Sequence, residues 1–325
     1  MLTLVTGGNG FVGRYLVEQL LAQGDRVRVV GRGSYPELSS LGVECIQADL
    51  SSPEAATALA GAMRGVEVVF HVAAKAGIWG SFEDFYRSNV TATQRVVRAA
   101  ERAGVPKFVY TSSPSVVIGE SDLAGVDEQT PYPARYLAPY PATKALAERY
   151  VLSRTAIAAT AIRPHLIWGR RDPHIFPRLL ARARAGRLVR IGDGTNMVDV
   201  TYVENVAEAH LLAAAALGER SALRGRAYFI GQEQPVKLWD FINEIVTRSG
   251  LKPVRRSLPL PVALRLAGIM EQTYRLLRLP GEPPLTRLMV SQLGRSHWFD
   301  HTAAQRDFGY GPRITTAEGL RRTLG

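Results

Sequence analysis

The sequence lacks the features that define several large classes of protein. Among 325 residues there is one cysteine, Cys45, so no intramolecular disulfide can form and no cluster of thiolate metal ligands exists. No apolar run reaches the roughly 18 residues of a membrane-spanning helix, and the N-terminus shows no basic segment followed by an apolar one. These absences predict a cytoplasmic protein that binds no metal.

Lysine is also scarce, since only five of the 40 basic residues are lysines. The formal net charge of +11 therefore comes almost wholly from arginine. The arginines are spread along expected helix faces without interleaved aromatic residues, which favours solvated faces and anionic small ligands over a nucleic-acid surface. A hydrophobic content of 46% with 21% charged residues is typical of a soluble globular protein.

A glycine-rich loop follows directly on the first apolar run. Residues 2–6 predict a strand, residues 7–13 read Gly-Gly-Asn-Gly-Phe-Val-Gly, and a helical pattern continues to about residue 23. A strand, a glycine loop and a helix in this order form the pyrophosphate site of dinucleotide-binding domains. Gly7 permits the tight turn, Gly10 lets the backbone approach the phosphates, and Gly13 lets the helix pack on the strand.

Strands and helices continue to alternate through the first half of the chain. Further strands are expected near residues 26–30, 43–47, 67–71 and 107–111, and a sixth ends at residues 161–164; a long helix is expected over 82–103. Repeated βαβ units imply a parallel sheet with right-handed crossovers. We expect an α/β fold, with a Rossmann doubly wound domain over 1–170 that also uses segments around 197–230. A smaller mixed α/β substrate lobe is expected over 171–325.

The end of the second strand predicts the type of cofactor. An acidic side chain there would accept a hydrogen bond from the ribose 2′-hydroxyl of NAD, whereas a basic one accommodates the 2′-phosphate of NADP. This chain has Gly31-Arg32, which favours NADP(H); NAD(H) is the alternative if Arg32 only points into solvent. The cofactor contacts expected besides Arg32 are Gly7, Asn9, Gly10, Phe11, Val12, Gly13, Asp49, Leu50, Ala73, Ala74, Tyr140, Lys144, Pro164, Leu166 and Ile167.

A tyrosine and a lysine four residues apart are candidates for acid–base chemistry. Tyr140 and Lys144 stand near the start of an expected helix, so their side chains lie one turn apart on one face. A nearby ammonium would lower the pKa of the phenol from about 10 towards neutrality, and such a phenol can exchange a proton with a carbonyl oxygen. The spacing alone is weak evidence, because exposed helices carry the same pair.

Hydroxyl groups follow the strand at 107–111. Ser113 is expected to donate to the oxygen that Tyr140 protonates, with Ser112 as its competitor. The alternative for either hydroxyl is that it only caps the turn.

An unusual loop, Lys-Ala-Gly-Ile-Trp-Gly, follows the strand at 67–71. Lys75 and Trp79 in this loop stand where open α/β sheets bind ligands. Lys75 is therefore a candidate for binding a substrate anion, and a purely surface role is its alternative. Asn89, on the helix over 82–103, is placed to order Lys144 through water.

The glycine loop, Ser113 and the segment from Tyr140 to Lys144 together resemble the extended short-chain dehydrogenase/reductase superfamily over the length of the chain. Residues 110–116 (YTSSPSV) and 296–300 (SHWFD) are similar to its 3β-hydroxysteroid dehydrogenase-like branch. Within that branch, the chain resembles the bacterial 2-alkyl-3-oxoalkanoate reductases of long-chain olefin biosynthesis at residues 73–81 (AAKAGIWGS), 163–169 (RPHLIWG) and 278–282 (RLPGE).

The resemblance implies roles for four residues of the expected catalytic site. Tyr140 would be the acid or base, and Lys144 its electrostatic partner and a ribose ligand. Ser113 would donate to the carbonyl oxygen, and Asn89 would be a relay. Many superfamily members have threonine in place of Ser113, which preserves the hydroxyl.

The resemblance also implies a reaction, in which NADPH reduces the 3-keto group of a long-chain, α-alkylated β-keto acid. The substrate contacts that it suggests are Lys75, Trp79, Ser115 and His165. Three other functions stay open: a 3β-hydroxysteroid (sterol) dehydrogenase, an NAD-dependent nucleotide-sugar epimerase or dehydratase, and a non-catalytic NADP(H)-sensing regulator.

Helices over 82–103 and 140–154 are similar to those that pair in superfamily dimers, so a homodimer is expected. The apolar, arginine-dotted stretch over 260–279 predicts a core or pocket-wall helix, and peripheral contact with a membrane is its alternative reading. A complex with other enzymes of a pathway is also compatible with the sequence.

Overall fold

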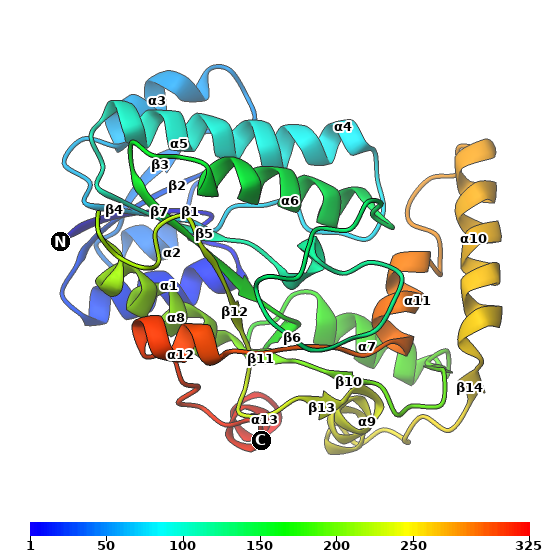
Figure 1. The fold of residues 1–325 in the computed structure, drawn as a ribbon. Helices are drawn as coiled ribbons and strands as arrows, with labels where there is room; N and C mark the ends of the chain where they lie inside the picture. Colours follow the sequence, from blue (N-terminus) through cyan, green and yellow to red (C-terminus); the bar gives the residue numbers. More distant parts are fainter.

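A seven-stranded parallel sheet forms the centre of the protein in the computed structural model, which describes residues 1–325. The strands lie in the order β12-β7-β5-β4-β1-β2-β3 (Figure 1). Their bounds are β1 Leu2–Thr6, β2 Arg26–Gly31, β3 Glu44–Gln47, β4 Val68–His71, β5 Lys107–Thr111, β7 Ala158–Pro164 and β12 Ala227–Ile230.

Helices cover both faces of this sheet. Alternate strand residues face opposite sides, so Val5 packs into one buried cluster and Leu4 into another. Strands buried on both faces are therefore almost continuously apolar, as expected for a parallel sheet. On the Val5 side lie α1 Phe11–Ala22, α2 Pro36–Ser39, α8 Val203–Ala216 and α12 Thr302–Phe308. On the Leu4 side lie α3 Ala55–Ala62, α5 Ala92–Arg102 and α6 Pro139–Leu152.

The strand order confirms the predicted Rossmann architecture. Successive strands extend the sheet from β1 through β2 to β3, and the chain then returns to place β4 on the other side of β1. The carboxyl ends of β1 and β4 therefore flank a topological switch point, where open α/β sheets bind their ligands. Residues from the second half of the chain complete the sheet, because β12 pairs with β7.

The helix expected over 82–103 is interrupted by a π-helical stretch. It begins as α4, Phe82–Phe85, continues as a π-helix over Tyr86–Thr91, and becomes α5 only at Ala92. A π-helical turn inserts one residue into the helical repeat, which hydrophobic spacing does not reveal. The insertion matters because Asn89 lies in it and is buried.

The rest of the chain builds a smaller lobe with its own apolar core around Trp168, Tyr202 and Trp239. Its largest sheet has the order β13-β10-β15-β6, and two two-stranded sheets pair β11 with β8 and β14 with β9. These strands are β6 Leu123–Val126, β8 Ile167–Trp168, β9 Arg190–Ile191, β10 Met197–Val198, β11 Thr201–Tyr202, β13 Val236–Lys237, β14 Ser257–Leu258 and β15 His297–Phe299. The helices are α7 Ile175–Arg184, α9 Leu238–Arg248, α10 Leu260–Leu276, α11 Arg287–Gly294 and α13 Thr316–Leu324.

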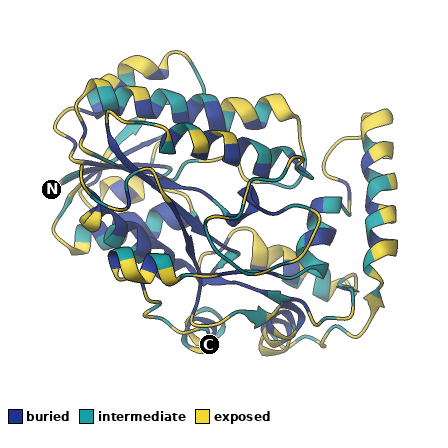
Figure 2. Cartoon of the chain, viewed as in Figure 1, coloured by how far each residue is buried: buried dark blue, intermediate teal, exposed yellow.

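Buried residues gather around the central sheet and in the core of the smaller lobe, and α10 is the most exposed long helix. Figure 2 shows a dark, buried central sheet and an α10 that stands at the edge of the molecule with much of its surface exposed. No helix of the protein is both long enough and apolar enough to cross a bilayer.

Candidate active site

The glycine loop brings three backbone segments into contact at the switch point. Gly7 has φ of +70°, and a Cβ there would lie 2.9 Å from the backbone of Ala73, beyond the end of β4. A Cβ on Gly13 would lie 2.2 Å from the carbonyl oxygen of Gly7. Gly10 caps α1 without any side-chain hydrogen bond to the first turn. The backbone N–H groups of this turn are therefore free to face an anion, and the loop fits the pyrophosphate of a dinucleotide.

The expected adenosine contacts lie at the ends of β2 and β3. Arg32 is exposed, and its backbone oxygen accepts a hydrogen bond from Gln47 Nε2 at 2.9 Å. The Asp49 carboxylate accepts hydrogen bonds from the backbone N and the hydroxyl of Ser51, and these bonds lower its pKa. Leu50 is buried.

Tyr35 was not predicted, yet it packs against this corner. Its hydroxyl accepts a hydrogen bond from Gly33 N at 3.1 Å, and a Cβ on Gly31 would lie 2.4 Å from the same oxygen. The absence of a side chain at Gly31 is the sequence signal that could have indicated a close neighbour. The tyrosine thus shapes the surface on which Arg32 sits.

The other residues expected to contact the cofactor differ in their exposure. Asn9, Gly10 and Ala74 are exposed, Phe11 and Ala73 are partly buried, and Val12 is buried. Pro164, at the end of β7, is buried, and Ile167, at the start of β8, is partly buried. Leu166 has φ of +37°, a left-handed conformation that costs a branched residue free energy. These residues lie where they were expected in the chain, and their contact with a cofactor stays a prediction.

Tyr140 and Ser113 come together from different elements. Tyr140 is the second residue of α6, and Ser113 follows β5. Burial raises the pKa of the Tyr140 phenol above its usual value, and the neighbouring Ser113 hydroxyl offsets only part of the rise. The Ser113 oxygen also accepts from Ser115 N at 3.2 Å, which leaves its proton for Tyr140. Ser112, the competitor, is buried, and its hydroxyl has no partner.

Lys144 is buried beneath this pair. Its ammonium donates to the backbone oxygen of Thr111 at 2.5 Å and lies 4.2 Å from the centre of the Tyr110 ring. Burial lowers the pKa of Lys144 to about 7, against an opposing effect of Glu148. The prediction that Lys144 lowers the pKa of Tyr140 is wrong for this structure. The ammonium points at Thr111 and Tyr110, and the burial of the phenol dominates its pKa.

Asn89 forms hydrogen bonds with both the start of α6 and the loop after β4. Its Oδ1 accepts from Lys75 N at 2.7 Å, while Nδ2 donates to Lys75 O at 3.1 Å and to Thr143 Oγ1 at 3.0 Å. Thr143 Oγ1 in turn donates to the backbone oxygen of Tyr140 at 3.0 Å. The Asn89 side-chain amide thus bonds to the Lys75 backbone and to the Thr143 hydroxyl, and no hydrogen bond joins it to Lys144.

A chain of hydrogen bonds behind the site fixes the protonation of His71. Ala73 N donates to Thr6 Oγ1, which leaves the Thr6 proton for His71 Nδ1 at 2.7 Å. Thr93 Oγ1 donates to the backbone oxygen of Asn89, so it must accept from His71 Nε2 at 2.9 Å. Burial lowers the pKa of His71 to about 3, so the ring is neutral at pH 7. The chain joins the ends of β1 and β4 to the π-helical stretch.

Lys75 and Trp79 lie on the open side of the site. The Lys75 ammonium is 5.0 Å from the centre of the Phe85 ring and 3.9 Å from Asp84 Oδ2, with 40% of the side chain exposed. The edge of the Phe85 ring faces the Tyr140 ring at 6.5 Å between centroids. The Phe85 ring thus neighbours both the Lys75 ammonium and the Tyr140 ring.

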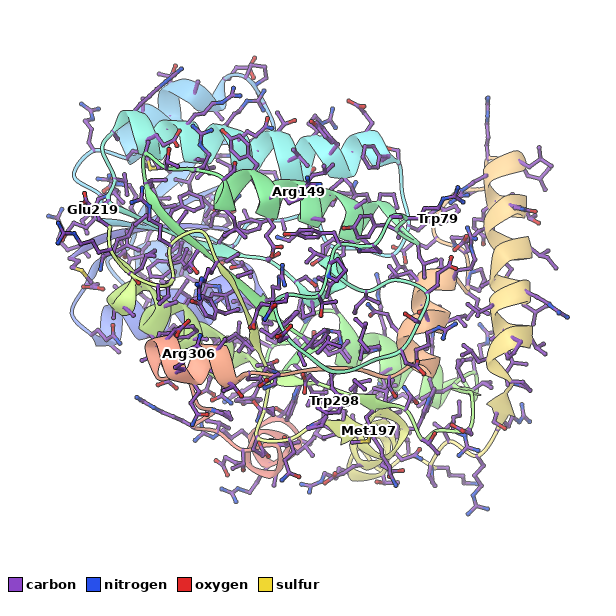
Figure 3. All side chains as sticks on the ribbon, viewed as in Figure 1. Trp79, Arg149, Met197, Glu219, Trp298 and Arg306 are labelled. Carbon is purple, nitrogen blue, oxygen red and sulfur yellow. The ribbon has the colours of Figure 1, made fainter.

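Trp79 lines a groove of about 380 Å³ between the loop, the start of α6 and helix α10. Figure 3 shows Trp79 beside α10, where its ring meets the Tyr274 ring edge-on at 6.4 Å. The groove is also lined by Pro139, which directly precedes Tyr140 in the chain. Its lining consists of Ile78, Trp79, Gly80, Ser81, Leu137, Ala138, Pro139, Glu271, Tyr274, Arg275 and Arg278.

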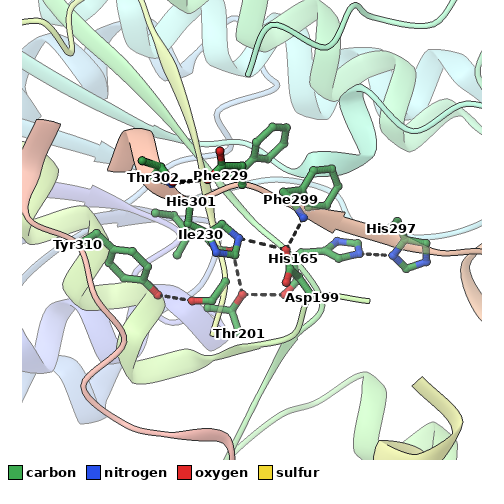
Figure 4. A network of polar contacts seen from close by, with 12 residues as sticks. His165, Asp199, Thr201, Phe229, Ile230, His297, Phe299, His301, Thr302 and Tyr310 are labelled. Carbon is green, nitrogen blue, oxygen red and sulfur yellow. Dashed lines mark hydrogen bonds and ion pairs between the residues drawn. The ribbon is translucent and has the colours of Figure 1, made fainter. Parts of the chain in front are cut away.

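Ser115 and His165 are both buried rather than placed in the groove. Ser115 is 4% exposed, and its hydroxyl has no partner. His165 Nε2 lies 2.6 Å from His297 Nδ1 (Figure 4). Because His297 Nε2 donates to Gln292 O, its Nδ1 accepts and His165 is the donor. Burial, aided by His297, holds the pKa of His165 well below its usual range.

A buried ion pair supports α6 one turn below Lys144, and it was not predicted. Arg163 on β7 makes two hydrogen bonds to the Glu148 carboxylate, at 2.9 and 2.7 Å. Tyr132 Oη donates to the same carboxylate at 2.6 Å. The sequence signal for this pair was an acid four residues after Lys144, on the inner face of the helix. A buried carboxylate requires a cation, so a basic partner could have been expected.

The chain shares its length and fold with known proteins. Residues 4–262 match the 3-beta hydroxysteroid dehydrogenase/isomerase family. A 2-alkyl-3-oxoalkanoate reductase of Stenotrophomonas maltophilia is 43% identical, over 99% of this chain and 98% of the relative. A sterol-4-alpha-carboxylate 3-dehydrogenase (decarboxylating) of Mus musculus is 35% identical, over 98% and 89%. The solved structure of Thermus thermophilus UDP-glucose 4-epimerase in complex with NAD has a TM-score of 0.75 at 25% identity, over 100% of this chain and 98% of its own.

Proposed function

Because the chain belongs to the 3-beta hydroxysteroid dehydrogenase/isomerase family and is an oxidoreductase, we propose that it reduces the 3-keto group of a long-chain 2-alkyl-3-oxoalkanoic acid with NADPH. The observation that carries the proposal is the Ser113–Tyr140 pair, in a chain 43% identical to a reductase of that name. The product would be the 3-hydroxy acid, and olefin or hydrocarbon biosynthesis its context.

The chain's own residues supply the proton and stabilise the developing charge. A bound nicotinamide cofactor supplies the hydride for the 3-carbon. Tyr140 donates a proton to the oxygen, and its raised pKa keeps the phenol protonated at neutral pH, as a reductase requires. Ser113 donates a second hydrogen bond to that oxygen as charge accumulates there. Lys144 would hold the cofactor ribose and, when protonated, would add positive charge below the site.

The two relatives suggest what the substrate must contain. A 2-alkyl-3-oxoalkanoate and a sterol 4α-carboxylate both carry a carboxylate on the carbon next to the one that is reduced or oxidised. A cation near Tyr140 would bind that carboxylate. Lys75 is our candidate, since the Phe85 ring contacts both its ammonium and the Tyr140 ring. Trp79 and Tyr274 offer apolar walls for the alkyl chains.

The corner formed by Gly31 and Arg32 supports NADP(H) as the cofactor. No carboxylate follows β2 to accept from a ribose 2′-hydroxyl, and the nearby Asp49 carboxylate is engaged by Ser51. The exposed Arg32 guanidinium would pair with a 2′-phosphate. NAD(H) stays the alternative, since the epimerase of similar fold was solved with NAD.

The first experiment is oxidation of NADPH and of NADH by the purified protein with a long-chain 2-alkyl-3-keto acid. We expect turnover with NADPH that Tyr140→Phe abolishes while still binding the cofactor, because the variant lacks only the transferable proton. A wild type that binds NADPH and leaves the keto acid untouched would refute the proposed substrate. The same assay with Lys75→Ala should show a raised KM, and an unchanged KM would remove Lys75 from the site.

A sterol dehydrogenase is the second candidate, favoured by the 35% identity to the mouse enzyme. The catalytic residues would be the same, and the reaction would run towards the ketone. Turnover of a sterol 4α-carboxylate, but not of an acyclic keto acid, would establish it.

We also propose a homodimer formed through α6 and the helical stretch over 82–102. Phe82 on α4, Tyr86 on the π-helical stretch and Leu146 on α6 are exposed by 50%, 36% and 39%, and the Phe82 and Tyr86 rings contact each other. Light scattering during gel filtration should show two copies, and Leu146→Arg should give one.

A further inference from the structure

Helix α10 leaves an apolar face uncovered. Val262, Leu266, Ile269 and Leu276 are exposed by 43%, 40%, 61% and 83%. Their spacing of three, four and seven residues places them on one side of the helix. The opposite side, with Ala263, Ala267 and Glu271, is the buried one. Beyond the helix, Leu277 and Leu279 extend the apolar surface.

The charges around this face have one sign. The only acid between residues 251 and 280 is Glu271, which is buried and accepts from Arg287 Nε at 2.9 Å. The next acid, Glu282, lies 3.6 Å from Arg178. The exposed basic residues of the stretch are Lys252, Arg255, Arg256, Arg265, Arg275 and Arg278.

The same helix forms a wall of the groove that Trp79 and Pro139 also line. Tyr274 and Arg275 of α10 and Arg278 just beyond it line the groove, and the Arg275 guanidinium lies 5.1 Å from the centre of the Trp79 ring. One side of α10 thus faces the groove while another presents leucine and isoleucine to the outside. A surface bound by the outer side would lie next to the mouth of the groove.

We propose that residues 252–279 bind the surface of a membrane that contains anionic lipids. The helix lies in the plane of the surface, with its apolar face among the acyl chains and its basic side chains at the phosphates. A helix unable to span a bilayer is suited to this position. A second copy fits the face less well, because a two-fold contact would bring six basic residues against the same six with no acid between them.

Membrane binding does not depend on the proposed substrate. The benefit of membrane binding for the reaction does depend on the substrate. If the substrate is a long-chain keto acid, the acid can pass from the lipid phase into the groove between α10 and Trp79 without crossing water. Vesicle binding and turnover are therefore measured separately, so that either can fail alone.

The test is co-sedimentation of the full-length protein with vesicles of phosphatidylglycerol and, in parallel, of phosphatidylcholine. We expect the protein to bind the neutral vesicles at least about tenfold more weakly than the anionic ones. Binding to the anionic vesicles should decline as salt is raised to about 0.5 M. Leu266→Gln/Ile269→Gln should reduce binding at least tenfold through the apolar face. Lys252→Gln/Arg255→Gln/Arg256→Gln should reduce it through charge.

Leu41→Gln is the matched control, because Leu41 is 46% exposed and lies in the cofactor-binding half of the chain. It should bind vesicles as the wild type does, and all variants should keep the wild-type melting temperature because the changed side chains are exposed. A wild type that ignores anionic vesicles, or a Leu266→Gln/Ile269→Gln protein that binds them equally well, would overturn the proposal. So would self-association of the wild type that this double variant abolishes, since the face would then be a contact between copies.

Discussion

Two consecutive serines show how much one position changes a side chain's surroundings. The Ser113 hydroxyl lies near enough to Tyr140 to lower the pKa of its phenol, whereas the Ser112 hydroxyl is buried without a partner. Strand β5 ends at Thr111, and its alternation directs neighbouring side chains to opposite sides. The sequence alone favoured Ser113 and left Ser112 as competitor, and the geometry now separates them.

Ser113→Ala should lower kcat by a factor on the order of 10²–10³, because it removes a donor to the developing oxyanion. Ser112→Ala should leave kcat near the wild-type value, since its hydroxyl does not contact Tyr140. Steady-state kinetics with the keto acid, together with NADPH binding by fluorescence, check both. Equal losses in the two variants would show that the assignment to Ser113 is mistaken.

Residue types and short spacings predicted the Tyr140–Lys144 pair, but they did not predict its electrostatics. The pKa of a phenol depends on how deeply the fold buries it, and burial is decided by segments far away in the chain. The same limit applies to His165, whose partner His297 comes from β15. The local sequence shows which side chain is present, whereas packing between distant segments decides what that side chain contacts.

At the scale of elements, the buried Glu148–Arg163 pair joins the catalytic helix to the sheet. Glu148 lies on α6 and Arg163 on β7, and both side chains are almost fully buried. Glu148→Gln leaves a guanidinium buried without its carboxylate. We expect a loss of about 3–5 kcal/mol in the free energy of unfolding.

The double variant Glu148→Gln/Arg163→Met should lose less than the single one, because no uncompensated charge remains. Urea unfolding of the wild type and of the variants measures these differences. A single variant as stable as the wild type would mean that the pair contributes nothing to the attachment of α6.

The regular elements were predictable where the signal was local. The glycine loop, the parallel alternation and the start of the catalytic helix all follow from neighbouring residues. The π-helical stretch over Tyr86–Thr91 was missed, because one inserted residue does not disturb the apolar pattern of the whole helix. Through this stretch Asn89 reaches both Lys75 and Thr143.

At the scale of the whole molecule, the buried neutral histidines should make the free energy of unfolding depend on pH. Burial lowers the pKa of His71 to about 3 and that of His210 to about 4. The same groups titrate near 6.5 in the unfolded chain. Between these values the unfolded state binds protons that the folded state does not, so stability is lost as the pH falls below about 6.5.

Each such histidine contributes a slope of about 1.4 kcal/mol per pH unit. His71→Gln should be less stable than the wild type at pH 7, because it loses two buried hydrogen bonds, yet its stability should decline less steeply between pH 6 and 4. Urea unfolding at several pH values gives both slopes. If the slopes of the variant and the wild type coincide, His71 is not the titrating group.

The last strand of the central sheet has a consequence for how the protein is made. Strand β12 joins β7 only after residues 165–226 have been synthesised. A ribosome adds roughly 5–20 residues per second, so the nascent chain exposes the free edge of β7 for several seconds. An open, apolar strand edge invites pairing with other chains. Translation of this stretch is therefore the interval in which chaperones can protect the growing protein.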